Sequence, residues 1–334
     1  MTDVVALVLW MGVTFYAVFG GADFGAGFWD LVAGGERRGR RARALIDAAI
    51  APVWEANHVW LIFSLVVLWT GFPEAFASLM STLFIPLTIA VFGIVLRGSG
   101  FAFLRVSTSL GARRTFGAVF AFSSLVTPFF LGAVAGGIAS GRVPAGNAQG
   151  GLVASWVNPT SMLGGVLAVA TCGYLTAVFL VADARRLEAP DLERYFRARA
   201  LVAGAAAGVI AFGGVFVLDS DAHHLFDRLT HEALPLVVLS ALCGVGALVA
   251  LVRGAPGPSR VLAVGAVATV VGGWGVAQYP NMLGTHLRLD AAAAPDATLA
   301  AILAVFGLAV VTCLPALALL YVLDQRGRLE PREH

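Results

Sequence analysis

Long apolar runs recur along almost the whole chain and are separated by short polar stretches. Nine of these runs are long enough to cross a bilayer, because a spanning helix needs about 20 mostly apolar residues. They cover approximately residues 4–24, 48–70, 76–98, 115–138, 160–182, 200–218, 233–252, 260–278 and 298–323. The pattern predicts an all-α polytopic membrane protein.

We expect one integral membrane domain over residues 1–334. Its helices are predicted to form a first four-helix bundle (1–138) and a second one (139–278), followed by a ninth helix with a cytoplasmic tail (279–334). No arginine-rich segment precedes the first run and no convincing cleavage site accompanies it. We therefore interpret this run as a retained helix and not as a signal peptide.

The basic residues are distributed unevenly between the connections. The chain has no lysine, and its 22 basic residues are all arginines. They concentrate in every second connection, and the other connections hold only Arg142, Arg228 and Arg288. Because positively charged loops remain in the cytoplasm, this alternation places the N-terminus outside and the C-terminus inside. An odd number of spans is then required, which agrees with nine.

The composition leaves little room for a soluble domain. Hydrophobic residues make up 59% of the chain and charged residues 13%, whereas soluble domains have about 25% charged residues. The three cysteines (Cys172, Cys243 and Cys313) lie inside apolar runs and lack the spacing of a disulfide framework or a zinc site. The sequence has no nucleotide-binding glycine loop between a predicted strand and a predicted helix. We also expect no nucleic-acid partner.

The run from Ile50 to Trp69 is unusual because its first half is polar. The polar residues are Glu55, Asn57 and His58, flanked by Trp54 and Trp60. An ionisable group in a membrane helix costs a few kcal/mol, so it usually has a partner or a function. A proton-handling role is our interpretation for Glu55. For His58 we favour a satisfied intrahelical histidine over a haem ligand, and for the two tryptophans we favour packing.

Two more ionisable groups are predicted at the depth of Glu55. Asp23 follows a glycine pair near the inner end of the first run, and Arg97 lies near the inner end of the third. Opposite charges in a membrane pair with one another or line a wet cavity. Asp23 and Arg97 can thus be a structural pair, or Arg97 can instead reach to the membrane surface. Alternatively, all three groups can form a proton path together with Asn57 and His58.

An outer connection carries a second group of titratable residues. His223, His224 and His231 lie in an acidic stretch and could gather a metal ion. Their spacing matches no strong metal motif, so a solvated polar loop is the favoured interpretation.

Several motifs together resemble subunit II of the cytochrome bd-type quinol oxidases. The motifs are GADFGAGF (Gly21–Phe28), IAPVWEANHVWLI (Ile50–Ile62), LRGSGFAFLR (Leu96–Arg105), VNP (Val157–Pro159) and the stretch Tyr279–Leu299. They occur in the family's order over nearly the whole chain. The resemblance implies a bacterial inner-membrane complex that oxidises quinol, reduces oxygen to water, and takes up cytoplasmic protons without pumping. It also implies that haems b558, b595 and d sit in a partner, subunit I, and that this chain binds none.

The same resemblance assigns roles to particular residues. It implies a proton path into subunit I that opens at Glu55, where an Asp is common, and it matches the family's Asp23 and Arg97. His58 follows Asn57 where Gln is often found, and Trp60 matches a tryptophan near the subunit boundary. Small single-helix subunits, membrane lipid and a structural quinone are further expected partners, and no residue of this chain is expected to be catalytic.

Two other functions remain open from the residues alone. One is a proton-coupled secondary transporter, although such proteins place their charges at the midplane between interrupted helices. The other is a purely structural scaffold subunit, which is compatible with every residue of the chain.

Overall fold

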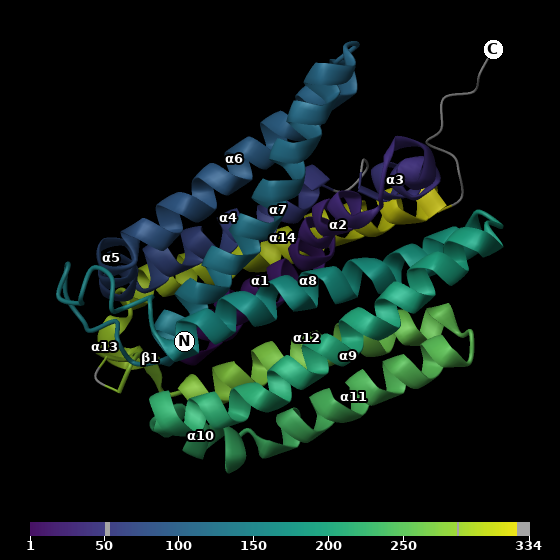
Figure 1. The fold of residues 1–334 in the computed structure, drawn as a ribbon. Helices are drawn as coiled ribbons and strands as arrows, with labels where there is room; N and C mark the ends of the chain where they lie inside the picture. Colours follow the sequence, from purple (N-terminus) through teal and green to yellow (C-terminus); the bar gives the residue numbers. More distant parts are fainter. Residues whose placement is uncertain (51–53, 286, 326–334) are drawn as a thin grey trace.

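The computed structural model of the chain describes residues 1–50, 54–285 and 287–325, and these residues are nearly all helical (Figure 1). The elements in chain order are α1 (Thr2–Phe15), the π-helical segment η1 (Tyr16–Gly20), α2 (Gly21–Val32), α3 (Glu36–Ile50), α4 (Trp54–Gly71), α5 (Pro73–Thr82), α6 (Phe84–Val106), α7 (Leu110–Ala139), α8 (Pro159–Arg186), α9 (Pro190–Asp221), α10 (His223–Thr230), α11 (Leu234–Val252), α12 (Pro256–Gln278), β1 (Asn281–Leu283), β2 (Leu287–Arg288), α13 (Leu289–Ala292) and α14 (Asp296–Gln325). The predicted all-α fold is confirmed.

Eight helices in the described part of the chain are long and apolar enough to cross a membrane. The number rises to nine if the pair 57–71 and 73–82, which bends by 118°, counts as one span. Local chemistry explains where many helices begin. Proline occupies the first turn of α5, α8, α9, α11 and α12, where its missing N–H costs nothing. Asn158 also caps α8 by accepting a hydrogen bond from the Ser161 N–H at 2.9 Å.

The first span is longer than predicted. The apolar run suggested a helix over residues 4–24, but α1, η1 and α2 form one span from Thr2 to Val32. The small residues after Gly20 do not end the helix, because they let it pack closely against α7 and α8. Asp23 therefore lies within a helix and not at its end.

The third predicted helix is also displaced. The sequence suggested residues 76–98, whereas α5 is a separate short helix and α6 continues to Val106. The break lies at Leu83, whose backbone has φ −101° and ψ 22°. Arg97 is consequently an interior residue of α6, nine residues before its end.

Three of the connections between the predicted spans contain short elements of their own. The arginine-bearing stretch after the first span forms α3, and its Arg43 Nε donates to Asp30 Oδ1 at 2.8 Å. The outer connection after α9 contains α10, and the stretch after α12 forms the antiparallel pair of β1 and β2 followed by α13. Hydrogen bonds within these segments and to neighbouring residues order them, and a hydropathy profile does not reveal such bonds.

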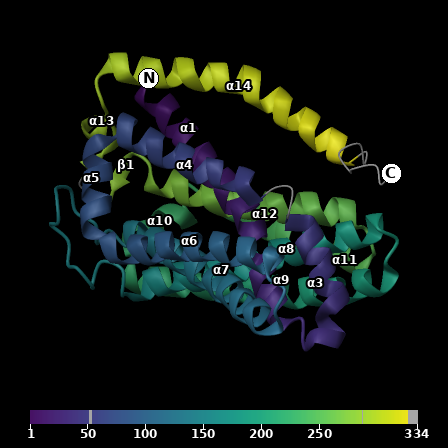
Figure 2. The same cartoon turned by 90° about the horizontal axis from the view of Figure 1, so that it is seen from above.

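Helix α8 lies at the centre of the packing, in contact with α2, α7, α9 and α12. The largest cluster of buried residues surrounds it and includes Tyr174, Leu175 and Val178. A Cβ atom on Gly132 would lie 2.3 Å from the Gly164 carbonyl oxygen, so only glycine permits this crossing of α7 and α8. By contrast, α14 runs along one edge and contacts α1 and α4 (Figure 2).

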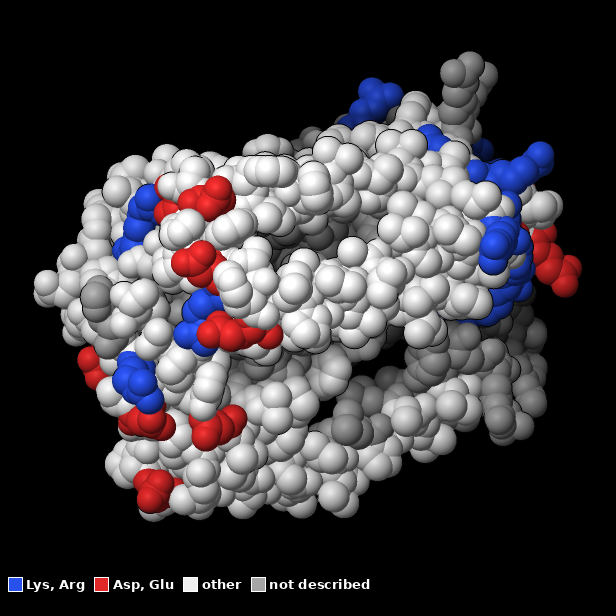
Figure 3. All heavy atoms as spheres, turned by 90° about the horizontal axis from the view of Figure 1, so that it is seen from below, with Lys and Arg blue, Asp and Glu red and all other residues white. Residues whose placement is uncertain are grey.

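Arginines and acidic residues concentrate at opposite ends of the molecule (Figure 3). Figure 3 shows arginines gathered at one end, whereas the opposite end exposes most of the visible acidic residues with a few arginines among them. At that second end, the two terminal guanidinium nitrogens of Arg142 donate to the Asp221 carboxylate, Nη2 at 2.7 Å and Nη1 at 3.0 Å. The backbone N–H of Thr160 also donates to Asp221, at 3.1 Å, so one carboxylate joins the loop after α7 to α8 and α9.

Candidate functional site: a buried ion pair beside a π-helical turn

The site is built around a π-helical turn in the first span. Segment η1 begins at Tyr16 and ends at Gly20, and Asp23 follows in the first turn of α2. A π-helical turn inside an α-helix accommodates an extra residue and changes the direction in which the following side chains point. A Cβ atom on Gly20 would lie 2.8 Å from the Tyr16 ring, so the turn requires glycine at that position.

Asp23 forms a fully buried salt bridge with Arg97 of α6. The Arg97 Nη2 atom lies 2.7 Å from Asp23 Oδ1, and each side chain is 1% exposed. The same Nη2 also donates to the Asp23 backbone carbonyl, at 3.2 Å. Desolvating two charges costs several kcal/mol each, and only close, well-hydrogen-bonded pairing compensates for that cost. Arg97 therefore does not extend to the membrane surface.

The rest of the Arg97 guanidinium is held by α7 and by two aromatic rings. Its Nε donates to Ser124 Oγ at 3.2 Å, and that hydroxyl donates to the Phe120 carbonyl at 2.7 Å. The guanidinium carbon lies 5.0 Å from the centre of the Phe24 ring and 5.2 Å from that of Phe120. Such cation–π contacts stabilise a desolvated cation by about 2 kcal/mol.

Helix α4 brings one of the predicted polar residues, His58, close to this pair. The His58 ring lies 5.9 Å from Phe24 and 6.3 Å from Tyr16, measured between ring centres. Asn57 is buried as well, with 9% of its surface exposed. The structure thus brings together in one cluster Asp23 of the first predicted span, His58 of the second and Arg97 of the third.

Three polar atoms of this cluster are buried and have no hydrogen-bond partner among the described residues. They are the Tyr16 hydroxyl, Asp23 Oδ2 and His58 Nδ1. Buried polar atoms are nearly always satisfied, so an unsatisfied group needs an explanation, such as a water molecule or a role in proton transfer. Their concentration beside a charged pair is the chemical feature that distinguishes this part of the bundle.

The cluster rests on close contact between α2 and α8. The Thr176 hydroxyl donates to the Ala22 carbonyl, and the Trp29 indole N–H donates to the Gly173 carbonyl at 2.8 Å. A Cβ atom on Gly25 would lie 2.1 Å from the Cys172 carbonyl oxygen. These contacts fix the position of α2, and therefore of Asp23, against the centre of the bundle.

Two predicted residues cannot be placed in the cluster. The side chains of Trp54 and Glu55 lie outside the described part of the structure, although both residues belong to the first turn of α4. Trp60 is described, and its ring packs 4.6 Å from that of Phe15, away from the ion pair. This contact lies within the chain, and the packing or subunit-interface role of Trp60 remains a prediction.

Sequence reasoning missed Tyr16 and Ser124. Tyr16 lies seven residues before Asp23, a spacing that places two residues on one helical face and could have indicated it. Ser124 carried no comparable signal, because serines that bond to their own helix are common in apolar runs.

The three histidines of the connection after α9, His223, His224 and His231, do not converge. His223 Nδ1 lies 3.1 Å from Asp219 Oδ1, and His231 Nδ1 lies 2.7 Å from the Asp227 carbonyl oxygen. His224 instead packs against the loop at Gly141. Across the residues that the structure describes, no three His, Cys, Asp or Glu residues come together in a way that could hold a metal ion.

Comparison with known proteins relates this geometry to a family. The model of the family "Cytochrome bd terminal oxidase subunit II" matches residues 1–324. The chain is 26% identical over 288 residues to "Cytochrome bd ubiquinol oxidase subunit 2" of Bacillus subtilis, covering 85% of this chain and 81% of that protein. It is 24% identical over 229 residues to a "Putative cytochrome bd menaquinol oxidase subunit II" of the same organism, covering 67% of this chain and 64% of that protein.

A solved structure supports the same fold. The bd oxidase from Geobacillus thermodenitrificans superimposes with a TM-score of 0.76 at 24% identity, covering 97% of this chain and 98% of the other. The family match and the apolar helices together identify a multi-pass protein of a bacterial membrane. The chain belongs to the family of subunit II of the cytochrome bd terminal oxidases.

Proposed function

We propose that this chain is the haem-free subunit of a complex that oxidises quinol and reduces oxygen to water. In this proposal, subunit I holds haems b558, b595 and d and carries out the redox chemistry. Family membership supports an oxidase partner. Small single-helix subunits, membrane lipid and quinone are further proposed partners.

We also propose that the Asp23–Arg97 cluster belongs to a path that carries protons from the cytoplasm toward subunit I. The three unpartnered atoms of Tyr16, Asp23 and His58 are the observation that carries this proposal. Each can accept or donate a hydrogen bond, and water molecules between them would form a chain along which protons move. The Asp23–Arg97 ion pair holds Asp23 Oδ1, which leaves Oδ2 for such a chain.

Glu55 is the proposed start of this path. It lies one helical turn before His58 on α4, so residues 55 and 58 occupy the same side of that helix. The clustering of arginines at the end that bears α3 agrees with a cytoplasmic location of that end (Figure 3). The N-terminus is then outside and the C-terminus inside.

The test uses the whole complex, isolated from its native membrane through a tag on this chain. A haem-rich partner with b- and d-type absorption is expected to copurify. Glu55→Gln is expected to lower oxygen-reduction turnover while leaving haem content and assembly unchanged. Glu55→Asp is the matched variant and is expected to retain most of the turnover, because it keeps a carboxylate.

Each part of the proposal would be contradicted by a different experimental result. Isolation of the chain alone, without a coloured partner, would contradict the oxidase assignment. Full turnover in an assembled Glu55→Gln complex would remove Glu55 from the path and would favour a purely structural subunit. The features of the site give no support to a secondary transporter, since its buried pair is a closed contact between packed helices.

A further inference from the structure

We propose that α2, α7, α8 and α9 form a binding site for one anionic phospholipid, with its phosphate at Arg199 and its acyl chains in the adjoining cavity. This site is separate from the proton path and does not depend on it.

The cavity is large and apolar. Its volume is about 400 Å³, within the range of small-molecule sites. Phe28 and Trp29 of α2, Phe129 of α7, Val169 of α8 and Val202 of α9 are among the side chains that line it. A second hollow of about 280 Å³ shares Phe129 and Val169 with the first, so the two adjoin. Two adjoining apolar hollows suit the two chains of one lipid.

The walls provide no hydrogen bond for a polar ligand. Trp29 is the lining residue with a polar side-chain atom, and its indole N–H already donates to the Gly173 carbonyl at 2.8 Å. A quinone ring in the cavity would leave its carbonyl oxygens unsatisfied, which costs about 1–3 kcal/mol for each buried group. A hydrocarbon chain has no such requirement.

A basic residue continues the wall of the cavity toward one end of the molecule. Val202, Ala203 and Ala206 line the cavity from α9. Arg199 precedes them by three, four and seven residues, so it lies on the same helical face. Helical side chains tilt toward the N-terminus of their helix, which directs Arg199 away from the cavity and toward the arginine-rich end. A lipid bound with its chains in the cavity would present its phosphate in that direction.

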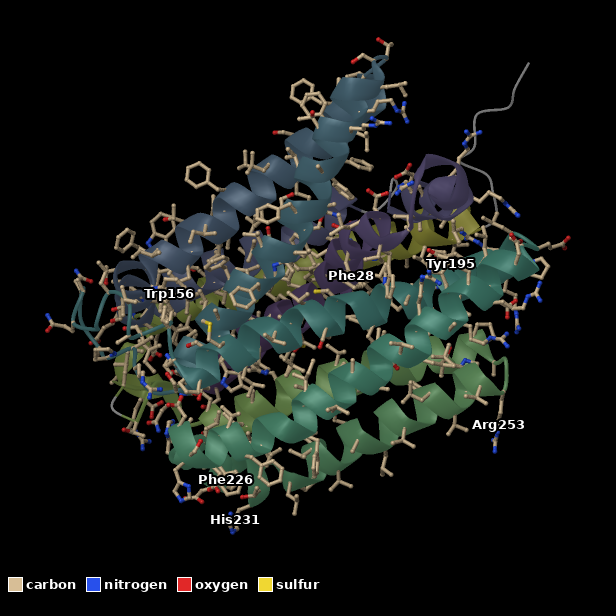
Figure 4. The ribbon with its side chains drawn as sticks, in the orientation of Figure 1. Phe28, Trp156, Tyr195, Phe226, His231 and Arg253 are labelled. Carbon is tan, nitrogen blue, oxygen red and sulfur yellow. The ribbon has the colours of Figure 1, made fainter. Side chains whose placement is uncertain are left out.

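Arg199 is available for an anion. Its guanidinium carbon lies 3.2 Å from the centre of the Tyr195 ring, and its Nη1 donates to the Tyr195 carbonyl at 3.1 Å. No carboxylate of the described residues forms a salt bridge with it, whereas the neighbouring Arg197 pairs with Glu193. Figure 4 shows Phe28 in the middle of the bundle and Tyr195 nearer the end that carries Arg253. The position of Tyr195 agrees with a tail-to-headgroup direction along α9.

The test measures lipid immobilisation on the purified oxidase complex in phosphatidylcholine nanodiscs. Spin-labelled phosphatidylglycerol and spin-labelled phosphatidylcholine are compared by electron paramagnetic resonance. The immobilised fraction is expected to favour phosphatidylglycerol by roughly fivefold per site, and the preference is expected to fall with added salt. Equal immobilisation of both lipids in the unaltered complex would overturn the proposal without any variant.

Paired variants locate the site. Ala206→Trp fills the cavity and is expected to abolish the excess of immobilised phosphatidylglycerol over phosphatidylcholine. Ala205→Trp changes the adjacent exposed residue, which does not line the cavity, and is expected to preserve this excess. Arg199→Gln is expected to remove the preference for phosphatidylglycerol, and Arg194→Gln on the same helix is the matched control. Haem absorption of each complex verifies assembly.

Two further results would overturn the assignment. One is an excess that survives Ala206→Trp. The other is solvent extraction of the unaltered complex that yields one quinone per complex, lost in Ala206→Trp, because the cavity would then hold a quinone.

Discussion

Asp23 and Arg97 are 74 residues apart in the chain, yet Arg97 Nη2 and Asp23 Oδ1 are 2.7 Å apart in the folded protein. The contact joins the first span to α6, and it lies beside the groups that we propose for proton transfer. Loss of this ion pair can therefore lower the stability of the subunit and the turnover of the complex, and substitutions can separate the two effects.

Arg97→Ala is expected to destabilise the subunit strongly. It would leave the Asp23 carboxylate buried and unpaired, which costs about 3–5 kcal/mol. Thermal unfolding of the purified complex, followed by loss of haem absorption, measures this effect. The control is Arg41→Ala, because Arg41 forms an exposed pair with Asp191 that is 67% and 45% exposed, and removing it should cost below about 1 kcal/mol.

The double variant Asp23→Leu with Arg97→Met separates stability from turnover. Replacing both charges by apolar residues leaves no unpaired buried charge, so most of the lost stability should return. Turnover is expected to stay low if Asp23 carries protons. A double variant that regains both stability and turnover would show that the pair is only structural.

Gly25→Ala is expected to disturb the packing of α2 on α8. The added Cβ would lie 2.1 Å from the Cys172 carbonyl oxygen, so the helices must separate. Overpacking of this kind typically costs about 1–3 kcal/mol. Gly208→Ala is the control, because nothing lies within 4 Å of its added Cβ, and the exchange should be neutral or stabilising. Equal unfolding temperatures for both variants would contradict the close contact.

Tyr16→Phe is expected to reduce oxygen-reduction turnover without lowering stability. The hydroxyl is buried without a partner, so its removal breaks no described hydrogen bond and leaves the ring contacts in place. Tyr174→Phe is the matched control, because its hydroxyl is also buried without a partner among the described residues but its ring belongs to the core around α8. A Tyr16→Phe complex with unaltered turnover would remove Tyr16 from the path.

His224 is expected to make the end of the molecule that bears α10 less stable in acid. Burial lowers the pKa of His224, and a hydrogen bond to the backbone of Ala139 opposes this effect only in part. The unfolded chain therefore binds a proton more readily, so stability is complete above a pH of about 6.5 and falls as the pH decreases below it. His224→Phe should reduce this pH dependence of the unfolding temperature, whereas the exposed His231→Gln should leave it unchanged.

Hydropathy predicted the membrane class and most helices, because an apolar run of spanning length has few alternatives. It could not predict α3 or α10, because these helices are amphipathic and are not apolar runs of spanning length. Charge reasoning placed Asp23 and Arg97 at one depth but could not decide between a pair and an arginine at the surface. That decision depends on Ser124 and two phenylalanine rings, which come from the packing of distant helices.

The π-helical turn at Tyr16–Gly20 lies just before Asp23, so the side of the helix on which the Asp23 carboxylate lies depends on the number of residues in this segment. The turn absorbs one extra residue, whereas each residue of a regular α-helix rotates the next by about 100°. Deleting one α-helical residue between the turn and Asp23 would therefore rotate Asp23 around the helix axis by that angle. The composition of the span and its hydropathy would hardly change, yet the carboxylate would no longer face Arg97. Insertions and deletions in this segment therefore act on the phase of the helix, and substitution studies alone would not detect that constraint.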